Sequence, residues 1–136
     1  MNRQMASAAI EAAVKESESL NVKMNIAIVD AGANLVAFVR MDNSLLVSVD
    51  ISQKKAKTAT FFNAPTGDIG NMSQPGGPLY NIEHSNQGLI TFPGGLPIHN
   101  STGNLIGGIG VSGDTVENDH RVAEVGRAAV MMILRK

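Results

Sequence analysis

Hydrophobic residues recur along this chain first with the period of a helix and then with that of a strand. Across residues 2–20 the apolar side chains stand three or four positions apart and no Gly or Pro interrupts them, so we expect an amphipathic helix with a small-residue face. Residues 23–30 and 35–41 each alternate with a period of two. The turn-forming residues 30–34 between them predict an antiparallel hairpin.

The middle of the chain contains a predicted helix, then a predicted loop, and then short predicted elements. Residues 48–62 again have helical periodicity, and Pro65 ends the predicted second helix. Residues 63–78 contain three prolines and four glycines without any period, so we expect a long surface loop, and loops of that length usually bind or cover something. Residues 79–86 predict one or two helical turns, and residues 89–92 predict a short strand.

The last third predicts two more strands and a final helix. Residues 96–99 and 105–111 read as strands on either side of a polar turn. Asp114 stands three positions before Glu117, as in a reciprocal N-cap, and an apolar stripe follows it. Because strands and helices do not alternate regularly, the order favours one α+β domain over residues 1–136, with a mostly antiparallel sheet covered by helices.

Composition narrows the classes of function. With 11 basic and 12 acidic side chains the net charge is −1, which excludes broad electrostatic binding of nucleic acid or of an anionic membrane. The absence of cysteine excludes disulfides, thiolate metal sites and thiol nucleophiles. There is neither an apolar run long enough to cross a membrane nor a signal peptide, so we expect a cytoplasmic protein, with secretion by a leader outside this sequence left open.

Residues 108–113 have the glycine spacing of a dinucleotide-binding fingerprint, between a predicted strand and a predicted helix. Only 23 residues follow, too few for the further strand and acidic residue that such a fold needs. Asp114, Glu117 and Asp119 also crowd the first turn of that helix, where they would repel a phosphate. We therefore interpret these glycines as permitting close packing or a subunit contact.

Five blocks of the sequence stand out when they are taken together. They are Val29–Gly32, Phe38–Asp42, Lys55–Ala59, Gly94–Ile98 and Gly107–Gly113. In this order they resemble the GlcG/HbpS-like family, which includes the C-terminal domain of PduO-type proteins. The similarity extends over nearly the whole chain, and five blocks in order are far more specific than any one of them.

The resemblance implies a profilin-like fold, with a five-stranded antiparallel sheet flanked by helices. It also implies assembly into symmetric homo-oligomers, commonly octamers. Members of the family are described as binding haem or a corrinoid, or belong to glycolate and diol metabolism with no assigned reaction. Because a shared fold does not transfer chemistry, whether this chain catalyses a reaction is left open.

The three histidines are the only nitrogen side chains suited to bind haem iron, since no thiolate is available. His99 ends a predicted strand beside a polar turn, and His84 lies in a short polar segment after the long loop. Both are candidate iron ligands, with a solvated side chain as the alternative at each position. His120 ranks last, because Asp119 and Glu117 favour its protonated form, which cannot bind a metal.

Two cationic residues are candidates for binding an anionic group. Arg40 at a strand end can bind a carboxylate or a haem propionate through paired hydrogen bonds, or it can form an ion pair with Asp42 or Asp50. Helical periodicity by default places Lys55 on a solvated face. Lys55 and Thr58 nevertheless belong to one of the family blocks and can point toward a pocket.

The predicted ligand site lies between residues 93–98, residues 107–113 and the loop at 65–78, whose glycines expose backbone to a flat ligand. Met41 and Met72 are weaker candidates for a soft axial ligand to iron. The residues predicted to contact the ligand are Arg40, Lys55, Thr58, Gly94, Gly95, Pro97, Gly110 and Ser112.

Three functions are compatible with these features. The first is a homo-oligomeric binding protein for haem or a related tetrapyrrole. The second is an accessory protein or enzyme of small hydroxy-acid or diol metabolism, which would bind a small polar substrate in the same cleft. The third is a structural assembly domain without a ligand, whose glycine-rich strand and alanine-faced helix form subunit contacts.

Overall fold

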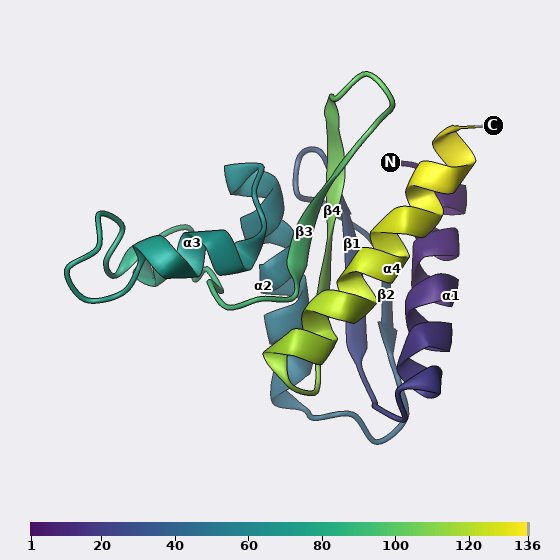
Figure 1. The fold of residues 1–136 in the computed structure, drawn as a ribbon, viewed down its shortest axis with the longest axis horizontal. Helices are drawn as coiled ribbons and strands as arrows, with labels where there is room; N and C mark the ends of the chain where they lie inside the picture. The colour runs from purple at the N-terminus through teal and green to yellow at the C-terminus, as the bar shows by residue number, and fades with distance from the viewer. Residues whose placement is uncertain (136) are drawn as a thin grey trace.

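The structure is a computed structural model and describes residues 1–135. Within these residues there are four α-helices, one 3-10 helix and four strands (Figure 1). Their order along the chain is α1 Arg3–Ser19, β1 Asn25–Asp30, β2 Leu35–Arg40, α2 Val47–Phe62, α3 Thr66–Met72, η1 Ile82–His84, β3 Gly95–His99, β4 Leu105–Ser112 and α4 Val116–Leu134.

The four strands form one antiparallel sheet in the order β2-β1-β4-β3. β1 and β2 pair directly, which confirms the predicted hairpin. β4 lies between β1 and β3 and pairs with both of them. The predicted α+β class with an antiparallel sheet is therefore confirmed.

Helices cover both faces of this sheet. α1 and α4 lie side by side against one face, and α2 lies against the other (Figure 1). Ile26, Ile28 and Ile109 fill the core under α1 and α4, and burial of each contributes roughly 1.5–3 kcal/mol. Small residues let these helices approach closely, since a Cβ added to Gly126 would lie 3.2 Å from the carbonyl oxygen of Ala9.

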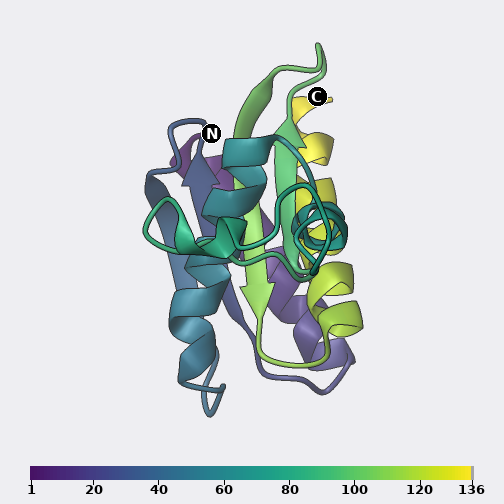
Figure 2. The same ribbon diagram turned by 90° about the vertical axis from the view of Figure 1, so that its left-hand side faces the viewer.

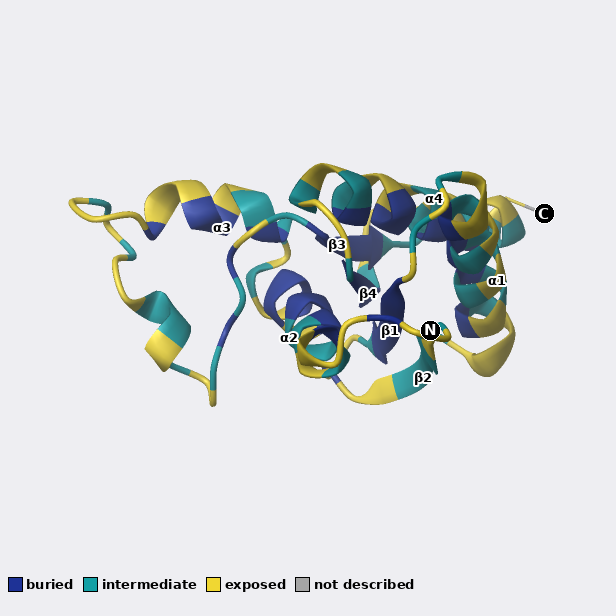
Figure 3. Ribbon diagram, turned by 90° about the horizontal axis from the view of Figure 1, so that it is seen from below, coloured by how far each residue is buried: buried dark blue, intermediate teal, exposed yellow. Residues whose placement is uncertain are grey.

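Residues 66–92, named the arm below, extend away from the sheet (Figures 1 and 3). Figure 2 shows the arm pointing toward the viewer. Much of its surface is exposed, but polar contacts hold its two sides together: the Thr91 hydroxyl donates to Glu83 at 2.6 Å, and the hydroxyl groups of Ser73 and Thr91 lie 3.3 Å apart. The arm is thus an ordered projection joined to the body at its two ends.

The arm is also where the sequence-based predictions differ most from the structure. The predicted loop at 63–78 contains the helix α3. The strand predicted at 89–92 does not form, because the backbone N–H of Ile90 donates to the hydroxyl of Thr58 at 3.2 Å instead of to a neighbouring strand. Within residues 1–135 the sheet therefore has four strands, and the expected fifth is not found.

The N-cap of the last helix is Thr115, one residue after the predicted Asp114. The side chain of Thr115, and not that of Asp114, accepts the backbone N–H of Asn118 at 3.2 Å. The Asp114 carboxylate instead accepts from the side-chain amide of Asn118 at 2.7 Å. Among the helices of residues 1–135, none is both long and apolar enough to cross a membrane.

Candidate functional site

Gly108 and Gly110 of β4 face helix α2. A Cβ added to Gly110 would collide with the carbonyl oxygen of Ser52 and lie 2.5 Å from the backbone nitrogen of Ala56. A Cβ on Gly108 would collide with the Thr60 hydroxyl. The backbone of α2 therefore occupies the space beside this strand, in agreement with the close-packing interpretation of the fingerprint-like glycines.

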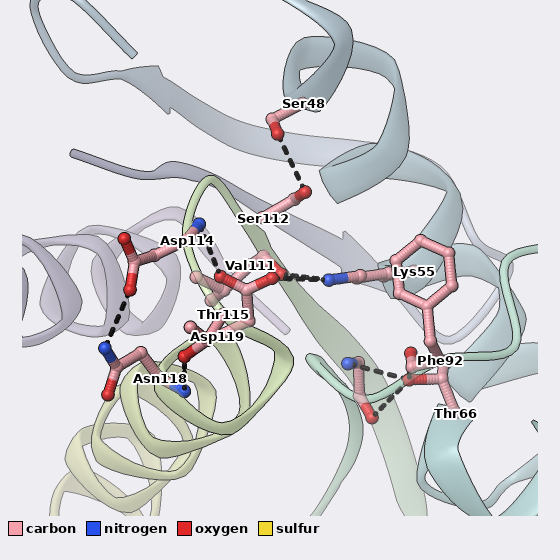
Figure 4. A network of polar contacts seen from close by, with 11 residues as sticks. Ser48, Lys55, Thr66, Phe92, Val111, Ser112, Asp114, Thr115, Asn118 and Asp119 are labelled. Atoms are coloured by element: carbon pink, nitrogen blue, oxygen red, sulfur yellow. Dashed lines mark hydrogen bonds and ion pairs between the residues drawn. The ribbon is translucent and has the colours of Figure 1, made fainter. Parts of the chain in front are cut away.

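Lys55 lies on the buried face of α2, where its side chain is fully shielded from solvent, so the expected solvated position is wrong. Its amine donates to the carbonyl oxygen of Val111 at 2.8 Å and to the carboxylate of Asp119 at 2.9 Å (Figure 4). The Phe92 ring covers it, with the amine nitrogen 4.9 Å from the ring centroid. The contacts of the Lys55 amine thus connect α2 with β4, α4 and the end of the arm.

Burial acts on both partners of this ion pair. Removal from water lowers the pKa of the Lys55 amine, and the attraction of Asp119 offsets only part of that effect. Burial likewise raises the pKa of the Asp119 carboxyl, against the opposing influence of Lys55. The free-energy difference between the charged pair and the neutral pair is therefore smaller than it would be for the same groups in water.

Gly94 and Gly95 are packed against the same ion pair. Gly94 has a φ of +127°, and a Cβ there would lie 2.6 Å from the Lys55 amine. The backbone N–H of Gly95 donates to the Thr66 hydroxyl at 2.9 Å, and that hydroxyl donates to the carbonyl oxygen of Phe92 at 2.8 Å. These contacts bring both ends of the arm to one point beside the sheet.

Three further predicted contact residues are engaged within the chain. The Thr58 hydroxyl donates to the carbonyl oxygen of Lys54 at 2.7 Å, besides accepting the N–H of Ile90. The hydroxyl of Ser112 donates to that of Ser48 at 2.9 Å (Figure 4). Pro97 is buried in β3 opposite Gly108. The residue at each of these positions has a structural partner, and its predicted role toward a ligand remains a prediction.

The histidines lie far apart along the chain and on different elements. His99 ends β3 with its Nε2 2.6 Å from the side-chain oxygen of Asn63, and it borders a hollow of about 230 Å³ with Met131. His84 is exposed at the end of η1. His120 lies on α4, 3.5 Å from a carboxylate oxygen of Glu124. Within residues 1–135 no three His, Asp or Glu side chains converge on one metal position.

Arg40 borders a broader hollow between α1 and the end of β2, of about 610 Å³, named the α1–β2 hollow below. Within the described residues 1–135, neither Arg40 nor the neighbouring Lys23 forms an ion pair, so the predicted alternative of a pair with Asp42 or Asp50 is not found. Asp50 pairs with Lys54 instead. The residues lining the hollow are Val14, Glu18, Asn21, Val22, Lys23, Val39, Arg40, Met41 and Asp42.

A smaller hollow of about 420 Å³ lies at the first turn of α4, named the α3–α4 hollow below. Pro93 and His120 border it. They directly follow Phe92 and Asp119, whose side chains contact the Lys55 amine. Asp68 and Glu117 give its rim a negative charge. Its residues are Pro65, Gly67, Asp68, Asn71, Pro93, Val116, Glu117 and His120.

Reasoning from the sequence missed Asp119 as the partner of Lys55, although the helical period contains the signal. Lys55 stands three and four positions from Ser52 and Ala59, which are buried on α2. Asp119 similarly precedes the buried Val122 on α4. A charged residue inside a stripe of small or apolar side chains on each of two helices predicts a buried pair.

The fold and these sites define a class of α+β proteins in which helices cover both faces of an antiparallel sheet. The family model described as "Haem degrading protein HbpS-like" matches residues 1–128, so this chain belongs to the HbpS-like family. This confirms the family resemblance of the sequence blocks.

Individual relatives agree with that assignment. The chain is 41% identical to the corrinoid adenosyltransferase PduO of Citrobacter freundii over 120 residues, which are 88% of this chain but 36% of that protein. It thus spans about a third of the length of its PduO relatives.

Two solved structures show the same fold. The crystal structure of the Klebsiella pneumoniae protein ORFY is 34% identical with a TM-score of 0.93, and the match covers 96% of this chain and 90% of that one. A crystal structure of a PduOC–haem complex is 35% identical with a TM-score of 0.90, and the match covers 95% of this chain and 94% of that one.

Proposed function

We propose that this protein binds haem or a related tetrapyrrole and acts as a homo-oligomer. The observation that supports this most is the α1–β2 hollow, which combines two cations free of ion pairs within residues 1–135 with an apolar lining. The related PduOC crystallised with haem, which makes haem the natural first ligand to test.

The hollow suits the two chemical parts of such a ligand. Arg40 and Lys23 are exposed at its rim and can pair with carboxylates, as on a haem propionate. Val14, Val22 and Val39 are partly buried and offer apolar contact to a flat ring. Glu18 and Asp42 line the same hollow and repel carboxylates, so the propionates would lie on the side of Arg40 and Lys23. In that orientation the residues present fit the carboxylates and the ring, and a bound haem would add iron for electron transfer or small-ligand binding.

Iron ligation would involve other side chains than those that bind the carboxylates. No histidine borders the α1–β2 hollow. Its lining does include Met41, and methionine is a residue type that can bind haem iron. The Met41 sulfur accepts the backbone N–H of Met24 at 3.4 Å. His99 and His84 lie outside the hollow and stay the ligands predicted from the sequence. Binding of the iron-free porphyrin separates the contribution of the carboxylates from that of the metal.

The proposed oligomer rests on apolar side chains that the single chain leaves exposed. Met72 and Tyr80 on the arm and Phe61 on α2 are all more than a third exposed. Assembly would cover such side chains. An octamer is the state that the family resemblance implies, and light scattering coupled to gel filtration measures it directly.

Titration of matched variants tests the ligand and its location. Arg40→Ala and Lys23→Ala should each weaken binding of both haem and protoporphyrin IX by about fivefold to tenfold, because each removes a charged hydrogen-bond donor. Lys57→Ala, which removes an exposed cation from the outer side of α2, is the matched control and should leave the affinity unchanged. Met41→Leu should alter the Soret band of the haem complex and not the affinity for protoporphyrin IX.

Other results would contradict this site. If His99→Ala or His84→Ala abolishes the Soret shift while Arg40→Ala and Lys23→Ala bind normally, the tetrapyrrole lies elsewhere. Absorbance changes that never saturate, and that no variant alters, would exclude specific binding altogether.

The α3–α4 hollow supports the second candidate, a protein that binds a small polar substrate of diol metabolism. Its acidic rim favours an uncharged diol over a hydroxy acid, since Asp68 and Glu117 repel a carboxylate. Glycerol should therefore raise the unfolding midpoint and glycolate should not. A protein that responds to neither compound nor to haem would be the third candidate, an assembly domain without a ligand.

A further inference from the structure

The amine of Lys55 lies behind a single aromatic ring. Asp119 and Val111 contact the amine from one side, and the Phe92 ring covers it from the other (Figure 4). Phe92 is itself 42% exposed, and its ring lies over the buried amine. Displacement of this ring would open a path from solvent to the amine.

Rotation of the Phe92 side chain needs no change in a helix or strand. Phe92 lies outside regular secondary structure, and the glycines at 94 and 95 follow it. Its carbonyl oxygen is held by the hydroxyl of Thr66 at 2.8 Å, so the backbone is fixed while the ring has solvent on one side. The Phe92 ring therefore covers the amine and can move without unfolding a helix or strand.

The pair of Lys55 and Asp119 has the chemistry of an amine nucleophile with its proton acceptor. Burial lowers the pKa of the amine and raises that of the carboxyl, so transfer of a proton between them costs less than in water. A lysine in such an environment reacts with carbonyl compounds when its unprotonated form is reached. A buried ion pair is often no more stabilising than apolar side chains of similar size. Fold stability alone therefore does not explain why this chain has a charged pair at these two positions.

The size and charge of the α3–α4 hollow indicate what kind of molecule can enter it and react with Lys55. Pro93 follows Phe92 in the chain and His120 follows Asp119, and both border this hollow. Its volume of about 420 Å³ accommodates a molecule of a few carbon atoms. The carboxylates of Asp68 and Glu117 disfavour an anion, and the polar rim favours hydroxyl groups.

We propose that Lys55 condenses reversibly with a small uncharged hydroxyaldehyde or hydroxyketone, which reaches it from the α3–α4 hollow when the Phe92 ring moves aside. The unprotonated amine nitrogen bonds to the carbonyl carbon, and Asp119 carries the two protons of that nitrogen, one after the other, to the former carbonyl oxygen. The oxygen leaves with both protons as water, which leaves an imine, and addition of water reverses the step. No oxidant or reductant takes part, and this activity is independent of tetrapyrrole binding.

Trapping with borohydride tests the proposal on the unmodified protein. After incubation with dihydroxyacetone and reduction with sodium borohydride, peptide mapping should find Lys55 labelled by the mass of the probe less one oxygen. The label should appear severalfold faster at Lys55 than at exposed Lys57, because the Asp119 carboxylate 2.9 Å from the Lys55 amine can move the protons of the condensation. The anion glyoxylate should show no such preference for Lys55.

Two variants complete the experiment. Phe92→Ala should accelerate labelling of Lys55 severalfold, whereas Lys57→Arg, the matched control, should leave it unchanged. Thermal unfolding of each variant confirms that it is folded. Labelling of Lys57 without labelling of Lys55, in both the unmodified protein and Phe92→Ala, would overturn the proposal and leave the Lys55–Asp119 pair with a structural role alone.

Discussion

At the scale of single residues, the buried pair of Lys55 and Asp119 is the most unusual feature of this chain. Both side chains are almost completely removed from water, and Asp119 also accepts the backbone N–H of Asp114 at 3.1 Å. Two charges buried together are tolerated only while each keeps its partner, because one left alone retains the full cost of desolvation.

This dependence predicts a strong coupling between the two positions. Lys55→Met should lower the free energy of unfolding by about 3–5 kcal/mol, because it leaves the Asp119 carboxylate buried without its partner. The double variant Lys55→Met/Asp119→Asn should be less destabilised than the sum of the single variants, since it buries no charge. Urea unfolding of all four proteins measures the coupling, and strictly additive losses would show that the pair does not act as a unit.

A second prediction at this scale concerns the glycine of β4 that packs against α2. Gly110→Ala should lower the free energy of unfolding by about 3 kcal/mol, because the added Cβ would collide with the backbone of Ser52. Gly103→Ala is the control: it has a φ of +85° and open space around it, so only backbone strain of about 1 kcal/mol is expected. Equal losses in the two variants, measured by urea unfolding, would contradict the packing role of Gly110.

Single residues also show where sequence reasoning reaches its limit. Arg40 was predicted to bind an anion, and the structure finds it in a hollow without an ion pair inside residues 1–135. Lys23 was missed, because an isolated lysine before a strand has no recognisable motif. The two meet because Asn25 pairs with Arg40 in the hairpin, a register that the alternating pattern alone does not specify.

At the scale of elements, the regular parts of the fold were predictable and the arm was not. Helices α1, α2 and α4 and strands β1 and β2 have clear hydrophobic periods, so the predicted and observed bounds differ by few residues. The arm has no hydrophobic period because few of its residues face the core. Its order comes from side-chain hydrogen bonds such as Thr91 to Glu83, which leave no pattern in the sequence.

This polar contact makes the arm sensitive to acid. The hydroxyl donated by Thr91 lowers the pKa of Glu83 below its usual 4.5, so the contact stabilises the arm fully above pH 4.5 and is lost as the pH falls through the lowered pKa. Tyr80 on the arm is the only tyrosine of the chain, so 3-fluorotyrosine gives one ¹⁹F resonance that reports on the arm. We expect this resonance to shift with a midpoint below pH 4.5.

Glu83→Gln provides the control for that titration. A glutamine can still accept from Thr91 but does not titrate, so the shift below pH 4.5 should disappear in this variant. A shift that persists unchanged in Glu83→Gln would show that another group controls the arm.

At the scale of the whole molecule, the layers determine which surfaces are open to a ligand. Helix α2 covers Gly108 and Gly110 of β4, so the backbone at these two glycines is packed against the protein itself. The α1–β2 hollow lies at the opposite edge of the sheet from β3 and the arm. The proposed tetrapyrrole site and the exposed apolar side chains of the arm are thus separate, and one chain can use both.

The location of the ligand is the central claim, and chemical-shift mapping with protoporphyrin IX on the ¹⁵N-labelled protein tests it most directly. The iron-free porphyrin is diamagnetic, so changes in amide shifts report contact alone. We predict the largest changes at residues 14–23 and 39–42, with loss of those changes in Arg40→Ala. Changes confined to residues 93–99 and 107–113, with residues 14–23 unaffected, would contradict the proposed site.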